Sequence, residues 1–536
     1  MRQAIEQFLY KHAAKAKPIE ISRNYASWDV NTRPTPGAQA KLEKLTAEFD
    51  LLYANPKEFQ QISLWYKEFL QIVEEDPLLG RQVQLLHHGY LMNQVPEETI
   101  RRLAKIQTEA EATFSKFRPI VKGKPLSDNE IRKILRESDD VEERKKAWVA
   151  SKEIGSEVAP MVKEMVVLRN QNARSLGFKN YYEMALKCQE LDPASLGRNL
   201  KDLADKTEEP YFRWKTKLDQ TLMKRFKCKP EELRPWHYAD PFFAQVPPSK
   251  DANLDSYFAD KNIEQLTKRT YDQLGLEIEK ILLQSDLHAR EGKCQHAFCL
   301  DLNHEGDIRV LCNIEPNEHW MMVMLHEFGH AVYDQYLSRD LPYLLQRPAH
   351  ILTTESMAML MGRQTHCYDW LTEVAGLPPA DIKKDLPKIL QEQAAGMILF
   401  MRWALVMVDF ESTMYADPEQ DLNKIWWNLV KKYQGLTPPE ERDFPDWAAK
   451  IHLTVAPVYY QNYILGELMA SQVRQFIKDE IPSGKLINNP YAGEFLKQHL
   501  FAPGARWDWN TLLMNSTGHP LDVNPFLNDF LPQLKI

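Results

Sequence analysis

The chain has 536 residues, of which 44% are hydrophobic and 26% charged, and this ordinary balance excludes a disordered or fibrous protein. Its net charge of −8 argues against nucleic acid or an anionic membrane surface as the main partner. The length fits roughly three or four average domains, or one large helical enzyme body.

The start of the chain and its cysteine content indicate in which cellular compartment the protein resides. Residues 1–20 contain no continuous apolar stretch of the kind that forms a secretory signal peptide. Six cysteines in a chain of this length do not form a disulfide framework. We therefore expect a cytoplasmic protein whose thiols are reduced.

Helical periodicity dominates the first third of the chain. Apolar residues recur at intervals of three and four in residues 40–53, 55–75 and 100–117. Ser127 followed by Glu130 is a capping-box signature and predicts the start of another helix. We expect the apolar stripes of these helices to lie in the core. Scarce glycine and frequent proline agree with many helices that end at prolines.

Three later segments break or extend this pattern. The proline-rich segment Arg234 to Ser249 predicts a long ordered loop with aromatic side chains. Two short apolar runs flank the turn-rich residues 303–307, so His296 to Ile314 predicts a β-hairpin. The most apolar stretch, Gly396 to Phe410, is interrupted by Arg402 and is too short to cross a bilayer, which predicts a buried core helix.

A metal-binding motif, HExxH, follows the predicted hairpin. His326 and His330 are four residues apart, so on an α-helix both imidazoles lie on one face, one turn apart. Their apolar neighbours indicate a buried helix, in which two histidine rings need partners. The alternative is a chance motif whose histidines make core hydrogen bonds. Gly329, which permits close approach of another element, and the features downstream favour one catalytic zinc ion.

The third ligand is predicted by exclusion and by burial. Tyr333 and Tyr336 stand where a metzincin needs glycine and histidine, which excludes that subclass. Glu355 lies on a following apolar helix, where an unpaired carboxylate would be costly. We predict Glu355 as the third ligand in preference to Glu411 or Asp369.

Such a site hydrolyses amide bonds. Zinc lowers the pKa of its bound water to about 7, and Glu327, beside the first ligand, is expected to take the proton as general base. Attack on the carbonyl creates an oxyanion, which needs a further donor, typically a Tyr or His. Residues 448–472 contain a Lys, a His and three Tyr close together and supply candidates.

The chain resembles the angiotensin-converting-enzyme-like family of zinc dipeptidyl carboxypeptidases, with a second likeness to the oligoendopeptidase F and thimet oligopeptidase group. The segments that carry the resemblance are NYASWDVNT near residue 24, HEFGHAVYDQY, the Glu355 segment, WWNLVKKYQGLTPP, and AAKIH followed by PVYYQNY. HYADPFF is closer to the oligopeptidase group. The resemblance implies a mainly α, two-lobed ellipsoid around a deep substrate channel, with a small sheet beside the HExxH helix. Residues 1–536 would form one catalytic domain, with residues 1–120 as a helical lid.

The resemblance also implies a substrate site. Residues expected to contact the peptide are His296, Ala297 and His452. Tyr463 would stabilise the oxyanion. Lys450 and Tyr460 would hold the substrate's C-terminal carboxylate, which would make the enzyme release dipeptides from that end.

Departures from the family pattern change some of these expectations. One extra residue precedes the tyrosine pair, so Tyr459 competes with Tyr460 for the carboxylate role. Asn462 stands where chloride-activated members have an Arg, which makes chloride activation doubtful. Met359 replaces a carboxylate that orients a zinc-ligand histidine, so that partner is unassigned.

We therefore predict a zinc peptidase that acts on oligopeptides and binds neither nucleic acid nor membrane. The alternatives are an endo-acting oligopeptidase that ignores the free carboxylate, a non-catalytic peptide-binding protein, and a structural zinc site closed by four protein ligands. Cys294 and Cys312 flank the hairpin as a family disulfide does, but we expect thiols.

Overall fold

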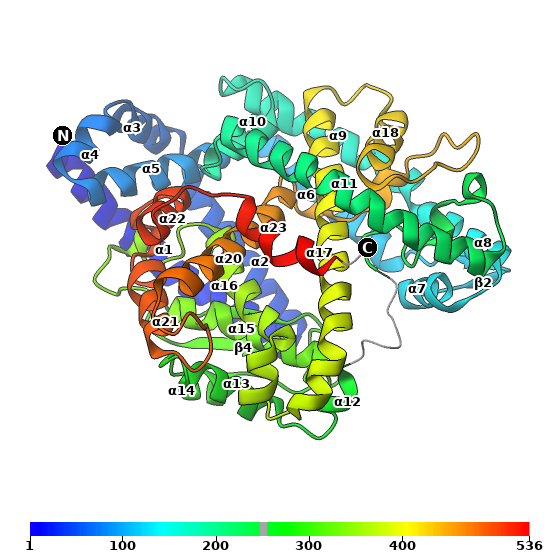
Figure 1. Ribbon diagram of the computed structural model, residues 1–536. Helices are drawn as coiled ribbons and strands as arrows, with labels where there is room; N and C mark the ends of the chain where they lie inside the picture. Colours follow the sequence, from blue (N-terminus) through cyan, green and yellow to red (C-terminus); the bar gives the residue numbers. More distant parts are fainter. Residues whose placement is uncertain (247–253, 535–536) are drawn as a thin grey trace. The chain divides into compact units, whose positions relative to one another are not determined.

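Two compact units make up the chain in this computed structural model, which describes residues 1–246 and 254–534. Unit 1 consists of residues 1–94, 253–386 and 465–526, and unit 2 of residues 95–252, 387–464 and 527–536. Helices dominate both units (Figure 1), and strands occur in the described residues only as two small antiparallel pairs. The predicted mainly α fold class is confirmed.

Unit 1 contains the N-terminal helices, the hairpin and the helix with the HExxH motif. Its elements are α1 (Arg2–Thr32), α2 (Pro36–Tyr53), α3 (Pro56–Lys67), α4 (Phe69–Glu75), α5 (Pro77–Met92), α12 (Asp255–Phe258), α13 (Ile263–Asp272), α14 (Glu279–Gln284), β3 (Phe298–Asp301), β4 (Ile308–Leu311), α15 (Glu318–Gln335), α16 (Ile351–Gly362), α21 (Pro490–Phe495) and α22 (Trp509–Thr517).

Unit 2 contains long helices and the segment with the predicted substrate residues. Its elements are α6 (Glu97–Lys116), β1 (Ile120–Val121), β2 (Lys124–Pro125), α7 (Asp128–Glu137), α8 (Val141–Lys152), α9 (Ile154–Ser175), α10 (Tyr181–Cys188), α11 (Pro193–Phe226), α18 (Leu422–Gln434) and α19 (His452–Val455). Three helices cross from one unit to the other: α17 (Pro379–Ala416), α20 (Tyr460–Glu480) and α23 (Asn524–Phe530).

The predicted hairpin is present in unit 1. β3 pairs antiparallel with β4, with Phe298 opposite Leu311 and Asp301 opposite Ile308. On its other side β4 forms one bridge, between Leu311 and Asp286. Among the described residues β3 has no second partner strand, although the carbonyl oxygen of Asp301 accepts a hydrogen bond of 3.2 Å from Nδ2 of Asn24 on α1.

Helix α1 is attached to the hairpin by both apolar and polar contacts. Trp28 packs against Leu302 and Leu311 in a buried cluster. At the tip of the hairpin the hydroxyl of Tyr25 donates a hydrogen bond of 2.7 Å to Asp307. The N-terminal helix therefore fixes the sheet that precedes the HExxH helix.

Three helix predictions need correction. The stripe predicted in residues 55–75 is divided between α3 and α4, because the chain leaves helical geometry at Glu68 (φ −93°, ψ 16°). The apolar stripe in residues 40–53 forms α2, but none of its residues is buried, although we expected core. Ile100, at the start of another predicted core stripe, is 42% exposed. The capping box of Ser127 and Glu130 is present as predicted.

The predictions for the proline-rich segment and for the apolar stretch around Arg402 agree with the structure. Residues 234–246 form an irregular loop with one short 3-10 turn, Pro235–His237; the end of the predicted loop, at 247–249, lies outside the described residues. The stretch around Arg402 lies in α17, the one described helix long and apolar enough to cross a membrane, but 72% of its most apolar window is buried within the protein. That burial favours the predicted core helix.

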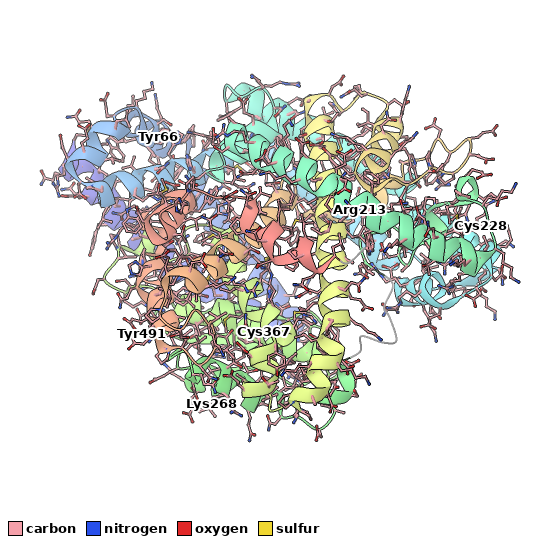
Figure 2. The ribbon with its side chains drawn as sticks, viewed as in Figure 1. Tyr66, Arg213, Cys228, Lys268, Cys367 and Tyr491 are labelled. Carbon is pink, nitrogen blue, oxygen red and sulfur yellow. The ribbon has the colours of Figure 1, made fainter. Side chains whose placement is uncertain are left out.

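The six cysteines all lie in the described ranges and are free thiols, so Cys294 and Cys312 agree with the expectation. Cys228 and Cys367 are labelled among the side chains in Figure 2. The boundary between the units falls at residue 94, so the predicted lid, residues 1–120, belongs partly to each unit. Its role as a lid stays a prediction.

Candidate metal and substrate site

Helix α15 carries the two histidines of the motif. Asn317 caps the helix by accepting a hydrogen bond of 2.9 Å from the backbone N–H of Trp320. The four-residue spacing places His326 and His330 on one face, with ring centroids 5.1 Å apart. Both rings can therefore converge on one ion.

Gly329 lets α15 and α16 approach each other closely. A Cβ atom at this position would lie 2.7 Å from Cα of Ala358 and 3.1 Å from the carbonyl oxygen of Met357. Both are backbone atoms of α16, which cannot move aside as a flexible side chain can. The hydrogen of glycine thus permits the contact expected from the sequence.

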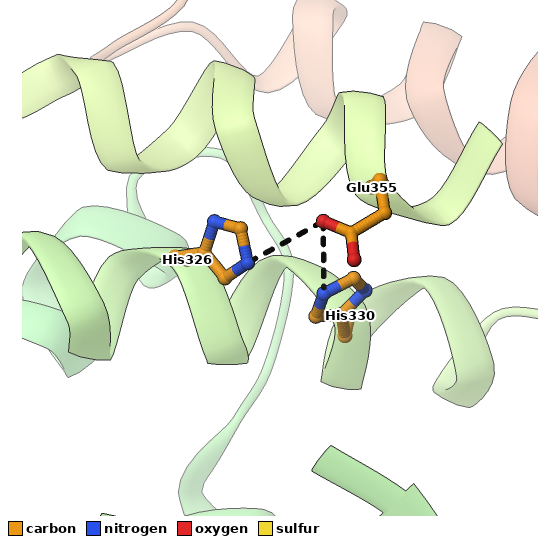
Figure 3. Close-up of side chains that lie close together, drawn as sticks. All are labelled: His326, His330 and Glu355. Carbon is orange, nitrogen blue, oxygen red and sulfur yellow. Dashed lines mark ion pairs between the residues drawn. The ribbon is translucent and has the colours of Figure 1, made fainter. Parts of the chain in front are cut away.

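The close packing brings a carboxylate to the histidines (Figure 3). Nε2 of His326 lies 3.6 Å and Nε2 of His330 lies 3.8 Å from Oε2 of Glu355. The three ligand atoms lie within 4.8 Å of one another. Among the described residues, neither Glu411 nor Asp369 joins this group. One ion with ligand distances of about 2.0–2.2 Å fits between the three atoms.

Burial sets the protonation of these side chains. It lowers the pKa of His326 to about 4, and burial together with the neighbouring ring lowers the pKa of His330 to about 3. Burial and the charge of Glu467 raise the pKa of Glu355 to about 7. The imidazoles are therefore neutral at pH 7, which is the form that binds a metal. Two neutral imidazoles and one buried carboxylate suit zinc.

Glu327 lies beside the first ligand and is also buried, with 8% of its surface exposed. Burial and, to a lesser extent, the charge of Glu355 raise the pKa of Glu327 to about 8. A carboxyl group with a pKa near the working pH can both accept and return a proton.

Two supporting contacts were not predicted from the sequence. Nδ1 of His330 lies 2.7 Å from the hydroxyl of Thr354, and with Nε2 as the ligand atom this nitrogen carries a proton and donates it to that hydroxyl. Arg363 forms an ion pair with Glu467, whose charge acts on Glu355. The only sequence signal for the first contact was the position of Thr354 next to Glu355.

The predicted carboxylate-binding residues and the predicted oxyanion donor lie together in unit 2. The ring of Tyr460 lies 5.2 Å from that of His452 and 5.4 Å from that of Tyr463, centroid to centroid. The indole N–H of Trp403 donates a hydrogen bond of 3.4 Å to the hydroxyl of Tyr460. Nζ of Lys450 lies 5.5 Å from the centre of the same indole ring.

Burial changes the charges in this cluster as well. It lowers the pKa of Lys450 to about 8, with Arg132 lowering it further and Asp240 opposing the change. Burial and the charge of Lys450 lower the pKa of His452 to about 4. Tyr460 shares Trp403 with Lys450, which favours Tyr460 as the partner of this lysine.

His296 and Ala297 lie immediately before β3, in unit 1, and His296 is exposed. They stand at the beginning of β3, which has no second partner strand among the described residues. The metal group lies in the same unit, whereas Lys450, His452, Tyr460 and Tyr463 lie in unit 2. Their joint action at one metal stays a prediction.

Comparison with protein families gives two matches. The model of peptidase family M3 matches residues 134–530, and the model described as angiotensin-converting enzyme matches residues 1–228. The two models together cover most of the chain.

Individual proteins described as angiotensin-converting enzymes are also similar to this chain. The angiotensin-converting enzyme of Theromyzon tessulatum is 24% identical over 457 residues, which are 78% of this chain and 72% of the relative. The rat enzyme is 24% identical over 76% of this chain and 33% of its own length. Mouse angiotensin-converting enzyme-like protein Ace3 is 21% identical over 82% of this chain and 64% of its own length. The chain thus spans about a third of the rat protein.

Proposed function

The chain belongs to peptidase family M3 and is a zinc metallopeptidase, and from this premise we propose that it releases dipeptides from the C-terminal ends of oligopeptides. The observation that carries the proposal is the arrangement of His326, His330 and Glu355 around one point, with Glu327 beside it. The finer claim, that the substrate's free carboxylate is recognised, rests on Lys450.

The reaction assigns a role to each nearby side chain. Zinc supplies an activated water and a polarised carbonyl when it is bound. Glu327 accepts the proton of the water and returns it to the leaving amine. His330 is kept in orientation by Thr354.

We assign the oxyanion to Tyr463 and His452. Nδ1 of His452 is buried without a hydrogen-bond partner among the described residues, so it is free to bond to a substrate. The rings of Tyr463 and His452 both contact the ring of Tyr460, which supports their joint assignment.

β3 has no second partner strand among the described residues, which supports a way to bind the peptide backbone at the start of this strand. An extended peptide can add to an unpaired strand through main-chain hydrogen bonds, whatever its side chains. His296 and Ala297 at the start of this strand are the residues that we propose for the contact. Such binding suits a peptidase of broad side-chain preference.

A peptide and its C-terminally amidated twin should differ strongly as substrates. Lys450 has lost hydration by burial, so an ion pair with a carboxylate restores a counter-charge that an amide cannot supply. We expect kcat/KM to fall about tenfold to a hundredfold on amidation, and all cleavage to cease with a chelator. In Lys450→Met the twins should be cleaved alike. Equal cleavage of the twins by the wild type would instead support the endo-acting oligopeptidase.

The preference for the free carboxylate should depend on pH. Because burial lowers the pKa of Lys450 to about 8, its ammonium is charged below that pH and neutral above it. The ratio of kcat/KM for the free peptide to that for the amidated peptide should be constant below about pH 8 and fall above it. Changes in Glu327 affect both peptides alike and cancel in the ratio. A ratio that is flat to pH 10 would contradict the role of Lys450.

The cellular location, the partners and the chloride dependence of the enzyme are also proposals. We propose a cytoplasmic enzyme that acts on oligopeptides and needs no nucleic acid, membrane or chloride. For chloride, the supporting observation is that Asn462 donates a hydrogen bond of 3.1 Å to Gln189, so its amide already has a protein partner.

A further inference from the structure

A strained backbone residue precedes the proposed oxyanion tyrosine. Val458 has a φ of 54°, a left-handed conformation that a β-branched residue adopts rarely because its side chain crowds the backbone. It is fully buried. Such a conformation persists only where the surroundings over-determine it, and such residues cluster at functional sites.

Both backbone polar groups of Val458 are held by side chains, two of which come from distant segments. Its N–H donates a hydrogen bond of 2.8 Å to Oε1 of Glu411, which lies on α17. Its carbonyl oxygen accepts one of 3.0 Å from Nε2 of Gln189, which follows α10, and one of 2.6 Å from Nε2 of Gln461. Glu411 and Gln461 are 2% and 1% exposed. Water therefore cannot replace the bonds that these two side chains make with Val458.

Gln189 extends this restraint into the first turn of α20. Its Oε1 accepts hydrogen bonds from Nδ2 of Asn462 at 3.1 Å and from Nε2 of Gln461 at 3.3 Å. One side-chain amide thus joins the strained residue to two residues of the helix that carries Tyr463. A rotation at Val458 would swing the start of this helix, because the helix begins two residues later.

We propose that Gln189 and Glu411 are positioning residues, which hold Val458 in its left-handed conformation and thereby place Tyr460 and Tyr463 for substrate. This inference rests on the proposed function of the two tyrosines. Neither residue touches the reacting atoms. Their effect is on orientation, to which catalysis is sensitive at the level of about 1 Å.

The test compares Glu411→Leu, Gln189→Leu and Glu411→Gln with the wild type on one peptide. Both leucine variants should lower kcat about tenfold to a hundredfold with little change in KM. Glu411→Gln keeps an acceptor for the Val458 N–H and should stay within about threefold of the wild type. Wild-type kcat in both leucine variants would overturn the proposal.

A matched control separates positioning from loss of stability. Gln472 is a buried glutamine that binds a loop: its Nε2 donates to the carbonyl oxygens of His519 and Pro520, and its Oε1 accepts from the N–H of Asp522. Gln472→Leu should lower the melting temperature as Gln189→Leu does but leave kcat and KM unchanged. An equal fall of kcat in the control would show that the effect is only structural and would overturn the inference.

A double-mutant cycle tests the route through Val458. Glycine adopts a positive φ without a side-chain clash, so Val458→Gly needs less restraint. Glu411→Leu should therefore reduce kcat less in the Val458→Gly background than in the wild type, by a factor of about five or more. Equal reductions in both backgrounds would show that Glu411 does not act through this conformation.

A different result would refute the proposed function of Tyr463 than would refute the positioning inference. If Tyr463→Phe keeps wild-type kcat, the oxyanion role of Tyr463 is wrong. If Tyr463→Phe loses activity while Glu411→Leu and Gln189→Leu keep it, the role of Tyr463 stands and the positioning inference is wrong.

Discussion

Replacing Glu327 by glutamine is expected to lower kcat by about 10²–10⁴-fold, because the amide cannot accept a proton from the attacking water. Zinc content and melting temperature should stay close to those of the wild type. Glutamine has nearly the same shape, and the carboxyl group with a pKa of about 8 is largely uncharged in the metal-free protein at pH 7. The measurements are kcat on a quenched fluorescent peptide, zinc per chain by elemental analysis, and thermal unfolding.

The control for this variant is Glu494→Gln, on α21. The side chain of Glu494 is 58% exposed and its replacement should change none of the three quantities. If Glu327→Gln retains activity within about tenfold of the wild type, the general-base role is refuted, since general-base catalysis accounts for about a hundredfold or more. If it loses zinc, the residue is part of the metal site itself.

The second large effect is expected from Gly329→Ala. The new Cβ would lie 2.7 Å from Cα of Ala358, a distance that real Cβ atoms do not show, so α15 and α16 must separate. Forced overpacking costs about 1–3 kcal/mol and occasionally more. Separation also moves Glu355 away from His330, so zinc affinity should fall about tenfold or more. Denaturant unfolding of the metal-free protein and zinc titration measure the two effects.

Gly396→Ala is the matched control for this substitution. Gly396 lies inside α17, and an added Cβ there meets nothing within 4 Å. Alanine in a helix interior is favoured over glycine by about 0.5–1 kcal/mol, so this variant should be slightly stabilised and keep its zinc. Wild-type stability and zinc affinity in Gly329→Ala would mean that the contact between the helices is not needed.

The metal group shows what sequence reasoning can reach. The spacing of His326 and His330 follows from the helical period alone, and the apolar neighbours of Glu355 show that its charge needs a partner. The structure brings all three together. The hairpin was also predictable, because turn residues between two apolar runs are a local signal.

Other features depend on contacts between distant segments and have no local signal. The burial of a helix stripe depends on what packs against it, so the stripe of α2 was predicted as core although none of its residues is buried. The ion pair of Arg363 and Glu467 joins residues from different helices. The left-handed conformation of Val458 contradicts the preference of valine and is imposed by Glu411 and Gln189.

The division of the chain into two units has a consequence for how the protein can be made. Each unit draws on three separated stretches of sequence, and α17, α20 and α23 each begin in one unit and end in the other. A single cut in the gene cannot yield either unit as a fragment with its full set of helices. Contacts between residues far apart in sequence slow folding, so both units must await synthesis of nearly the whole polypeptide. We expect truncated chains to be captured by chaperones or degraded.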